Sequence, residues 1–216
     1  MLEETLLTSD DADVREIAAW WLRRRPFGIA AVFREVRGVL ATDADPVRRA
    51  RAAEALGTFM FPTALPYLTD ALSDADAGVR AAAVTSLGRL NMPAAHGAIA
   101  SMFTDADRDV REAAVAQVLY VNDFNQHEAL LGLLADDDSM IRQRAALAVG
   151  TFGIESSVAA LQTLLSDENV RVRQSAAWAL GRIGTAEART ALNDGRAGET
   201  DRLVLDAYDV ALVTRR

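Results

Sequence analysis

The chain of 216 residues contains no cysteine and no lysine. Because cysteine is absent, the chain cannot form disulfides, thiolate zinc sites or iron–sulfur clusters, and it has no cysteine nucleophile. Because all 23 basic residues are arginine, it cannot form a Schiff base, anchor pyridoxal phosphate or supply the lysine of a phosphate-binding loop. These two absences exclude several large classes of enzyme.

Long apolar runs and a net positive charge are also missing. Although 50% of the residues are hydrophobic, no apolar run approaches the roughly 18 residues of a membrane span. The net charge of -8 argues against a nucleic-acid partner. Glu3 and Glu4 stand where a signal peptide carries positive charge. We therefore expect a cytoplasmic protein that contacts no membrane; the alternative is an exported protein whose signal peptide is absent from this sequence.

What the chain does contain is an internal repeat. Turn aspartates recur every 31 residues, at Asp43, Asp74, Asp105, Asp136 and Asp167. Six residues after four of them comes an arginine, at Arg80, Arg111, Arg142 and Arg173. Self-similarity at a period of about 20 to 50 residues is typical of a solenoid, in which each unit buries its apolar face against its neighbours.

Each copy of the repeat predicts two helices. One opens with Val-Arg or Ile-Arg, has small residues in its middle and closes with a Leu-Gly-like pair. Its core positions follow helical spacing, as in Val172, Ala176, Ala177 and Leu180. Predicted N-cap residues lie three positions before the first buried aliphatic, at Asp76, Asp107, Asp138 and Asn169. The second helix of each pair begins near Pro62, Pro93, Asn125 and Ser156.

With these Asp, Val-Arg, Ala-Ala and Leu-Gly positions, the sequence resembles HEAT repeats, in particular the short class named after phycobilisome lyases. The resemblance covers nearly the whole chain. It implies an all-α fold, a right-handed α-α superhelix (HEAT-like α-solenoid) of about six repeats of 31 residues plus a C-terminal capping helix. It also implies that the concave face is lined by the helices that begin near Val14, Val47, Val79, Val110, Ile141 and Val172.

We expect a single domain over residues 1–216, with an N-terminal cap at about 1–26, repeats at about 27–198 and a C-terminal cap at about 199–216. In the last segment, Leu203 lies 31 residues after Val172, which predicts an inward-packed helix with Val204 at the arginine position. Ala207 and Leu212 are expected to pack inward with them. The first repeat departs from the pattern, which indicates either a natural cap or a chain cut from something longer.

No metal or other cofactor is predicted. His96 and His127 occupy equivalent positions on neighbouring outer helices, and His127-Glu128 is similar to the iron-binding His-Glu pairs of deoxyhypusine hydroxylase, also a HEAT-like protein. That enzyme class needs four such pairs on inner helices, so we expect solvated or hydrogen-bonded histidines here. Asp74 and Asp76 have calcium-loop spacing, but Thr85 stands where a glutamate ligand is required. The turn acids are therefore interpreted as caps.

The arginines allow a structural and a functional interpretation. The repeat arginines either pair with turn carboxylates of their own or a neighbouring repeat, which would form a ladder of ion pairs along the stack, or bind an anionic partner. Recurrence in nearly every unit favours the ladder. A basic and aromatic cluster is formed by Arg23, Arg24 and Arg25 beside Trp20 and Trp21. These arginines either cover the end of the core with their stems or bind a phosphate or a nucleic acid, for which three charges are few.

The resemblance implies a non-enzymatic scaffold, expected to be monomeric, that binds a protein or peptide on its concave face. In the later repeats, inner-helix positions between the buried stripes become large and apolar, as is typical of interaction hot spots. The predicted partner-binding residues are Tyr120, Met140, Gln143, Arg144, Leu147, Arg171, Gln174, Trp178 and Arg182. Trp178 faces either this surface or the core, since tryptophan is mostly buried on average.

Two other functions stay open. The class name implies an accessory protein or lyase-like chaperone for a chromophore-bearing protein, which would need an apolar pocket and a cognate acceptor protein. The third possibility is a nucleic-acid enzyme similar to the HEAT-like alkylpurine DNA glycosylases. These have a basic concave face, whereas this chain is acidic.

Overall fold

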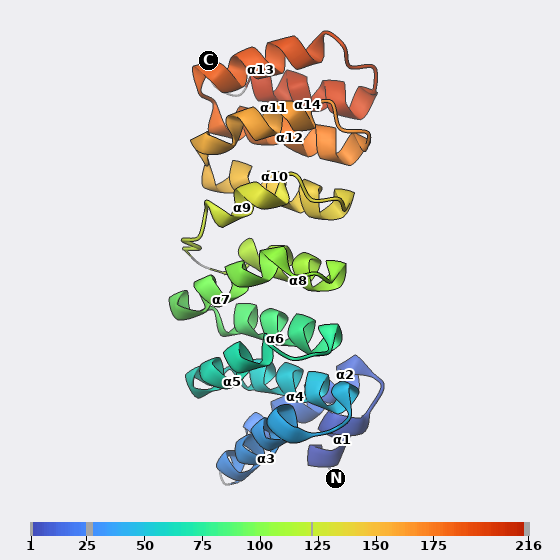
Figure 1. The fold of residues 1–216 in the computed structure, drawn as a ribbon, viewed down its shortest axis with the longest axis vertical. Helices are drawn as coiled ribbons and strands as arrows, with labels where there is room; N and C mark the ends of the chain where they lie inside the picture. Colours follow the sequence, from blue (N-terminus) through green and yellow to red (C-terminus); the bar gives the residue numbers. More distant parts are fainter. Residues whose placement is uncertain (1, 25–27, 122, 214–216) are drawn as a thin grey trace. The chain divides into compact units, whose positions relative to one another are not determined.

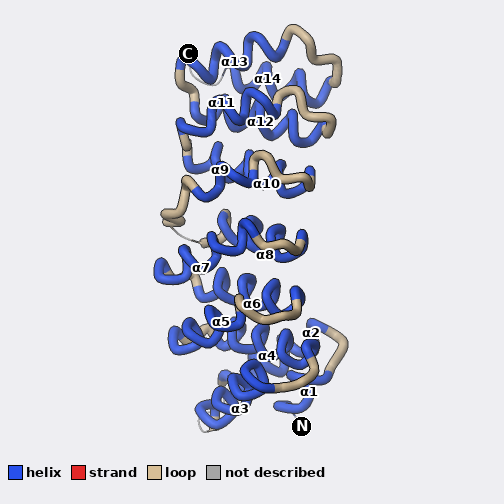
Figure 2. Tube along the Cα trace, viewed as in Figure 1, coloured by secondary structure: helices blue, strands red, loops and turns tan. Residues whose placement is uncertain are grey.

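The computed structural model describes residues 2–24, 28–121 and 123–213, and within these ranges it contains helices and turns but no strand (Figures 1 and 2). The predicted all-α fold is therefore confirmed. The chain divides into two compact units, Met1–Asn125 and Gln126–Arg216, here called unit 1 and unit 2. Among the described helices, none is both long and apolar enough to cross a membrane.

Short helices follow one another along both units. Unit 1 contains α1 (Leu2–Thr8), α2 (Ala12–Arg23), α3 (Ile29–Thr42), α4 (Pro46–Phe59), η1 (Pro62–Ala64), α5 (Leu65–Ala71), α6 (Ala77–Leu90), η2 (Pro93–Ala95), α7 (His96–Ser101), η3 (Met102–Thr104) and α8 (Arg108–Val118). Unit 2 contains α9 (Ala129–Leu133), α10 (Ser139–Phe152), η4 (Glu155–Ser157), α11 (Val158–Leu164), α12 (Val170–Ile183), α13 (Ala186–Arg196) and α14 (Arg202–Val213).

Within each unit the helices form two layers, which we call inner and outer (Figure 1). The inner helices pack against one another in chain order: α2, α4, α6 and α8 in unit 1, and α10, α12 and α14 in unit 2. All of them except α14 carry the Val-Arg or Ile-Arg motif. Most of the outer helices are shorter, although α3 has 14 residues, and several follow a turn of 3-10 helix. Pro62 and Pro93 each stand at the first position of such a turn, where proline's fixed φ and missing N–H are tolerated.

Small residues let the inner helices approach closely. Val172, Ala176, Ala177 and Leu180 are all 0% exposed, as their spacing predicts. The glycine of the Leu-Gly pair lies at the contact with the next inner helix, since a Cβ on Gly150 would come within 2.7 Å of the Cα of Ala179. The motif is thus explained by helix–helix packing.

The turn acids cap the inner helices as predicted. Asp138 accepts hydrogen bonds from the backbone N–H groups of Met140 and Ile141 at 2.9 and 3.2 Å. The same role belongs to the other predicted caps and to two further residues: Asp76, Asp107, Asn169, Asp11 and Asp45. Capping therefore accounts for the residue just before each of these inner helices.

The first acid of each turn joins the predicted arginine ladder, which is also confirmed. Arg80 donates through Nη1 to the carbonyl of Asp74 in its own repeat at 2.9 Å. Its Nε and Nη2 both donate at 2.8 Å to the carboxylate of Asp105 in the next repeat. The guanidinium of Arg80 holds the pKa of Asp105 below its ordinary value. The other described pairs of this kind are Arg49–Asp74, Arg142–Asp167 and Arg173–Glu199.

The predicted register of the last helix is wrong by one residue. Val204 and Tyr208 are the buried residues of α14, whereas Leu203 is 59% exposed. The N-cap-like Asp201, which accepts from the N–H groups of Leu203 and Val204, lies 32 residues after the cap Asn169. One extra residue between α12 and α14 shifts the helix, so Leu205 and not Val204 takes the arginine position. The predicted helix itself is present.

Candidate functional site

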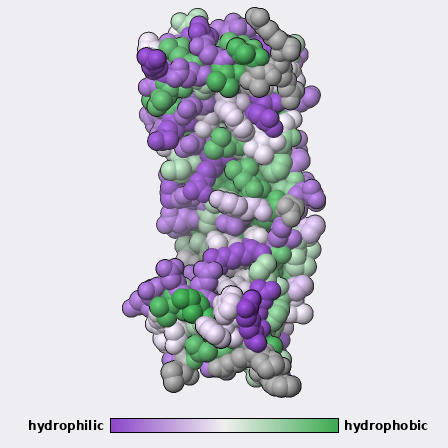
Figure 3. Space-filling model, turned by 180° about the vertical axis from the view of Figure 1, so that it is seen from behind, coloured by the Kyte–Doolittle hydropathy of each residue, from purple (hydrophilic) through white to green (hydrophobic). Residues whose placement is uncertain are grey.

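The inner helices of unit 2 form a groove of about 720 Å³. It is lined by α10, α12 and α14, which pack side by side. The lining residues are Gln143, Leu147, Gln174, Ser175, Trp178, Gly181, Arg182, Leu203, Asp206, Ala207, Val210 and Ala211. On the side of unit 2 turned away in Figure 1, apolar surface lies among polar surface (Figure 3).

Two rows of side chains run across this groove, one residue from each helix. The apolar row consists of Leu147, Trp178 and Val210, spaced 31 and 32 residues apart in the chain. Four positions before each of these residues lies a member of the polar row, which consists of Gln143, Gln174 and Asp206. Residues four apart share one face of a helix, so the two rows lie next to each other along the groove.

Trp178 lies in the middle of the apolar row. Trp178 is not a core residue, because 36% of its surface is exposed. The edge of its ring is close to α10, where a Cβ on Gly150 would meet the ring carbon Cζ3 at 2.9 Å. The guanidinium carbon of Arg182 lies 5.9 Å from the ring centroid, within the range of a cation–π contact. The open choice between groove and core is thus resolved in favour of the groove.

The polar row has free hydrogen-bonding capacity. In the described part of the chain, the side-chain amides of Gln143 and Gln174 make no hydrogen bond, and Asp206 forms no ion pair. Each amide offers two donors and one acceptor oxygen, and the carboxylate offers acceptors only. These donors and acceptors are therefore available to hydrogen-bond a ligand in the groove.

The predicted binding residues divide into those that line the groove and those that do not. Gln143, Leu147, Gln174, Trp178 and Arg182 line it together. The other predicted residues lie elsewhere: Met140 and Arg171 are exposed at the starts of α10 and α12, Arg144 is half-buried on α10, and Tyr120 is 78% exposed in the turn after α8 of unit 1.

The wall that α14 contributes to the groove was not predicted. Leu203, Asp206 and Val210 line the groove, but the 31-residue register assigned Leu203 to the core and left Val210 without a role. Because Val210 lies 32 residues after Trp178, allowing for one inserted residue in the last repeat would have placed it in the apolar row.

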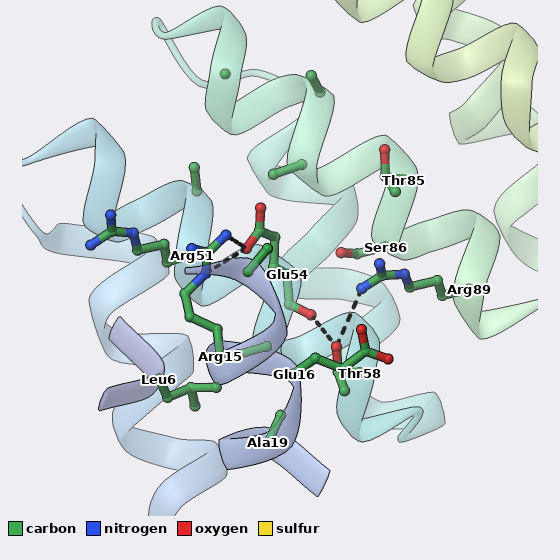
Figure 4. A pocket seen from close by; sticks show the side chains of 16 residues that line it. Leu6, Arg15, Glu16, Ala19, Arg51, Glu54, Thr58, Thr85, Ser86 and Arg89 are labelled. Atoms are coloured by element: carbon green, nitrogen blue, oxygen red, sulfur yellow. Dashed lines mark hydrogen bonds and ion pairs between the residues drawn. The ribbon is translucent and has the colours of Figure 1, made fainter. Parts of the chain in front are cut away.

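A second, smaller groove of about 350 Å³ lies on the inner helices of unit 1. Figure 4 shows Arg15 of α2 directed at Glu54 of α4, to which its Nε and Nη2 donate at 3.1 and 2.9 Å. Arg89 of α6 donates to the hydroxyl of Thr58 at 3.3 Å (Figure 4). Arg15 and Glu54 thus pair within this groove, Arg51 pairs with Asp10 outside its lining, and alanines line much of the rest of it.

The predicted basic and aromatic cluster lies at the end of α2. Trp20 and Trp21 are 43% and 56% exposed and meet edge to face at a centroid distance of 5.1 Å. The guanidinium of Arg24 lies 3.9 Å from the centroid of Trp20, and Nη1 of Arg23 lies 3.6 Å from the sulfur of Met60. These contacts agree with stems covering apolar surface, while Arg25 lies outside the described residues.

The histidine prediction needs a correction. His96 is only 1% exposed, and neither ring nitrogen has a hydrogen-bond partner among the described residues, so it is neither solvated nor hydrogen-bonded. It packs against Phe124 at a centroid distance of 5.4 Å. His127 stacks on Phe152 at 4.9 Å. Within the described residues, no three His, Cys, Asp or Glu side chains gather as a metal site would require.

Comparison with known proteins agrees with this architecture. A family model of HEAT repeats matches residues 34–119 and 128–212, which is most of the chain. The chain belongs to the HEAT-repeat family. No curated protein matches its sequence significantly.

Solved HEAT-like and armadillo structures share the fold of this HEAT-repeat chain. The X-ray structure of YibA from Escherichia coli matches with a TM-score of 0.69 and 18% identity, over 100% of this chain and 81% of that one. The complex of CpcE and CpcF of phycocyanin lyase from Nostoc sp. PCC7120 matches with a TM-score of 0.52 and 21% identity, over 98% and 92%. A designed armadillo repeat protein in complex with the peptide (KR)4 matches with a TM-score of 0.55 and 18% identity, over 97% and 96%. At these identities, the matches establish the fold alone.

Proposed function

We propose that this HEAT-repeat protein is a non-catalytic binding module that holds a protein or peptide segment in the groove of unit 2. The observation that carries the proposal is the apolar row, in which large side chains from three helices line one groove: Trp178 and Val210 are exposed, and Leu147 is half-buried. Burying exposed apolar and aromatic surface is the main source of affinity at protein interfaces, and tryptophan is among the residues most enriched at hot spots.

Related folds give further support. A designed armadillo repeat protein of similar fold was crystallised with a peptide, and CpcE and CpcF form a complex with each other. The same stack of helices therefore serves peptide and protein binding in other molecules. Because the chain has no cysteine or lysine, this groove offers neither a thiolate nor an amine nucleophile.

The second candidate is an accessory protein for a chromophore-bearing partner. The groove of about 720 Å³ with Trp178 at its centre is within the size range of small-molecule sites, about 300–1,000 Å³. It would have to hold a cofactor and a protein acceptor at once. We favour the simpler protein or peptide ligand because the groove is an open row across three helices and its polar groups suit a polypeptide backbone.

A selection experiment tests the proposal. Peptides are selected from a phage-displayed random library on the wild-type chain, and their affinities are measured for Trp178→Ala and for the control Trp21→Ala in unit 1. We expect Trp178→Ala to weaken binding by about 2 kcal/mol or more and to lower the free energy of unfolding by less than the about 3–5 kcal/mol of a buried tryptophan. Selected peptides that bind both variants equally, or no selected peptides at all, would refute the assignment of the groove.

A further inference from the structure

Resting on that proposed function, we infer that the groove of unit 2 binds a segment in the polyproline II conformation, with apolar side chains at every third position and a basic residue at the α14 end. The inference comes from the spacing of the two rows, from the free amides of the polar row and from the charge of Asp206.

The spacing of the apolar row selects the backbone conformation. Packed helices lie about 8–10 Å apart, and the glycine contacts Gly150–Ala179 and Gly181–Ala211 hold these three helices together closely. A polyproline II segment rises about 3.1 Å per residue and has three residues per turn, so residues three apart lie about 9 Å from each other on one face. Every third side chain of such a ligand would therefore contact one member of the apolar row: Leu147, Trp178 or Val210.

Other backbone conformations fit less well. A β-strand places same-face side chains about 6.7 Å apart, which does not match the step from one helix to the next. A docked α-helix could place residues seven apart at about 10 Å, but its backbone groups are already bonded within the helix. Such a ligand would leave the amides of Gln143 and Gln174 without backbone partners.

The polar row matches an extended backbone instead. A polyproline II segment has no internal hydrogen bonds, so its carbonyl groups are free to accept from the NH₂ groups of Gln143 and Gln174. These amides stand one helical turn from the apolar row on the same face. Each helix thus offers one apolar contact and one polar contact to each turn of the ligand.

The third member of the polar row changes the chemistry at one end. Asp206 of α14 is a carboxylate at the position that glutamine occupies on α10 and α12. It accepts hydrogen bonds but cannot donate them, and it forms no ion pair with described residues. A basic side chain on the ligand would complement it, which fixes the direction in which the segment lies across the three helices.

Defined peptides test the inference. A fluorescein-labelled, proline-rich peptide with leucine at every third position and a terminal arginine is titrated with the wild-type chain, and binding is followed by fluorescence anisotropy. An isomer of the same composition with leucine at every second position is the matched control. We expect the first peptide to bind about tenfold more tightly, because only its leucines have the same spacing as the side chains of the apolar row.

Three variants separate the contributions of the rows. Trp178→Ala should weaken binding about thirtyfold, the equivalent of a hot-spot side chain. Gln174→Leu should weaken it about two- to tenfold through the lost hydrogen bond, whereas Gln162→Leu on α11 should have no effect. Asp206→Asn should remove the preference for the peptide with arginine over its glutamine analogue, and Asp194→Asn on α13 should retain it.

In these titrations, the inference would be overturned by equal affinities for the two leucine isomers, or by a Gln174→Leu effect no larger than that of Gln162→Leu. These outcomes are distinct from failure of the proposed function. If selected library peptides depend on Trp178 but form helices or lack the three-residue spacing, the groove binds peptides of another conformation. If no peptide depends on Trp178, both proposals fail.

Discussion

At the scale of single residues, the two acids of each turn have different tasks. The residue two positions after the first acid, such as Asp138, caps the helix that follows it through the backbone N–H groups of its first turn. The first acid, such as Asp167, both accepts from the N–H of Asn169 at 2.8 Å and receives Arg142 from the preceding repeat. A pattern that resembles a cation site is thus explained by hydrogen bonds within the protein.

Removing a cap should destabilise the protein measurably. We expect Asp138→Ala to lower the free energy of unfolding by about 1 kcal/mol, because two N–H groups at the start of α10 lose their acceptor. Urea unfolding followed by circular dichroism measures this change. Asp194→Ala is a suitable control, since Asp194 is exposed in α13 and caps no helix. Equal effects of the two substitutions would contradict the capping role.

At the scale of elements, the contact between neighbouring inner helices depends on glycine and alanine. Gly150 of α10 faces Ala179 of α12, and Gly181 of α12 faces Ala211 of α14, where an added Cβ would approach the Cβ of Ala211 to 2.5 Å. The three helices that bear the groove are therefore held at a separation set by these small residues. A larger side chain at either glycine would widen the step between members of the apolar row.

A matched pair of glycine substitutions tests this point. Gly150→Ala should destabilise unit 2 by about 1–3 kcal/mol, because the new methyl group overpacks the contact with Ala179. Gly132→Ala in α9 meets no atom within 4 Å, so it should be neutral or stabilising by up to about 1 kcal/mol through helix propensity. Urea unfolding of both variants gives the comparison. Destabilisation by both, to the same extent, would show that close approach is not the cause.

The same elements show what the sequence could and could not predict. The inner helices, their caps and the ladder follow from local chemistry repeated at a fixed period, and each of these predictions is confirmed in the described residues. The register of α14 does not follow from that period, because a single inserted residue turns Val204 and not Leu203 toward the core. For the same reason Asp206 and Val210 were missed. The exposure of Trp178 depends on the room left beside Gly150, which is a property of packing between helices.

At the scale of the whole molecule, the arginine ladder connects repeats in both units. Its described ion pairs are mostly buried: the side chains of Arg142 and Asp167 are 12% and 7% exposed, and those of Arg173 and Glu199 are 17% and 6% exposed. Exposed pairs of this type contribute only about 0–1 kcal/mol, but removing one partner of a buried pair leaves a desolvated charge. The ladder should therefore make stability sensitive to the ionisation of its carboxylates.

This sensitivity has a definite sign. Arg49 lowers the pKa of Asp74 from 3.8, and Arg173 lowers the pKa of Glu199 from 4.5. The folded state thus binds fewer protons than the unfolded state at acid pH. The stabilisation is fully present above the unfolded pKa values and is lost as the pH falls from about 4.5 through the lower pKa values of the folded state.

The ladder's share of this acid sensitivity can be isolated with one variant. Glu199→Gln should lower the free energy of unfolding at pH 7 by about 1–3 kcal/mol, because the partly buried guanidinium of Arg173 loses its charged acceptor. Below pH 4.5 the difference between the variant and the wild type should shrink, since the wild-type carboxylate becomes protonated and resembles the amide. Urea unfolding at a series of pH values measures the difference, and Glu187→Gln on α13, an exposed acid outside the ladder, is the control. A wild-type advantage over Glu199→Gln that stays constant from pH 7 to strongly acid pH would show that the charge of Glu199 does not stabilise the fold.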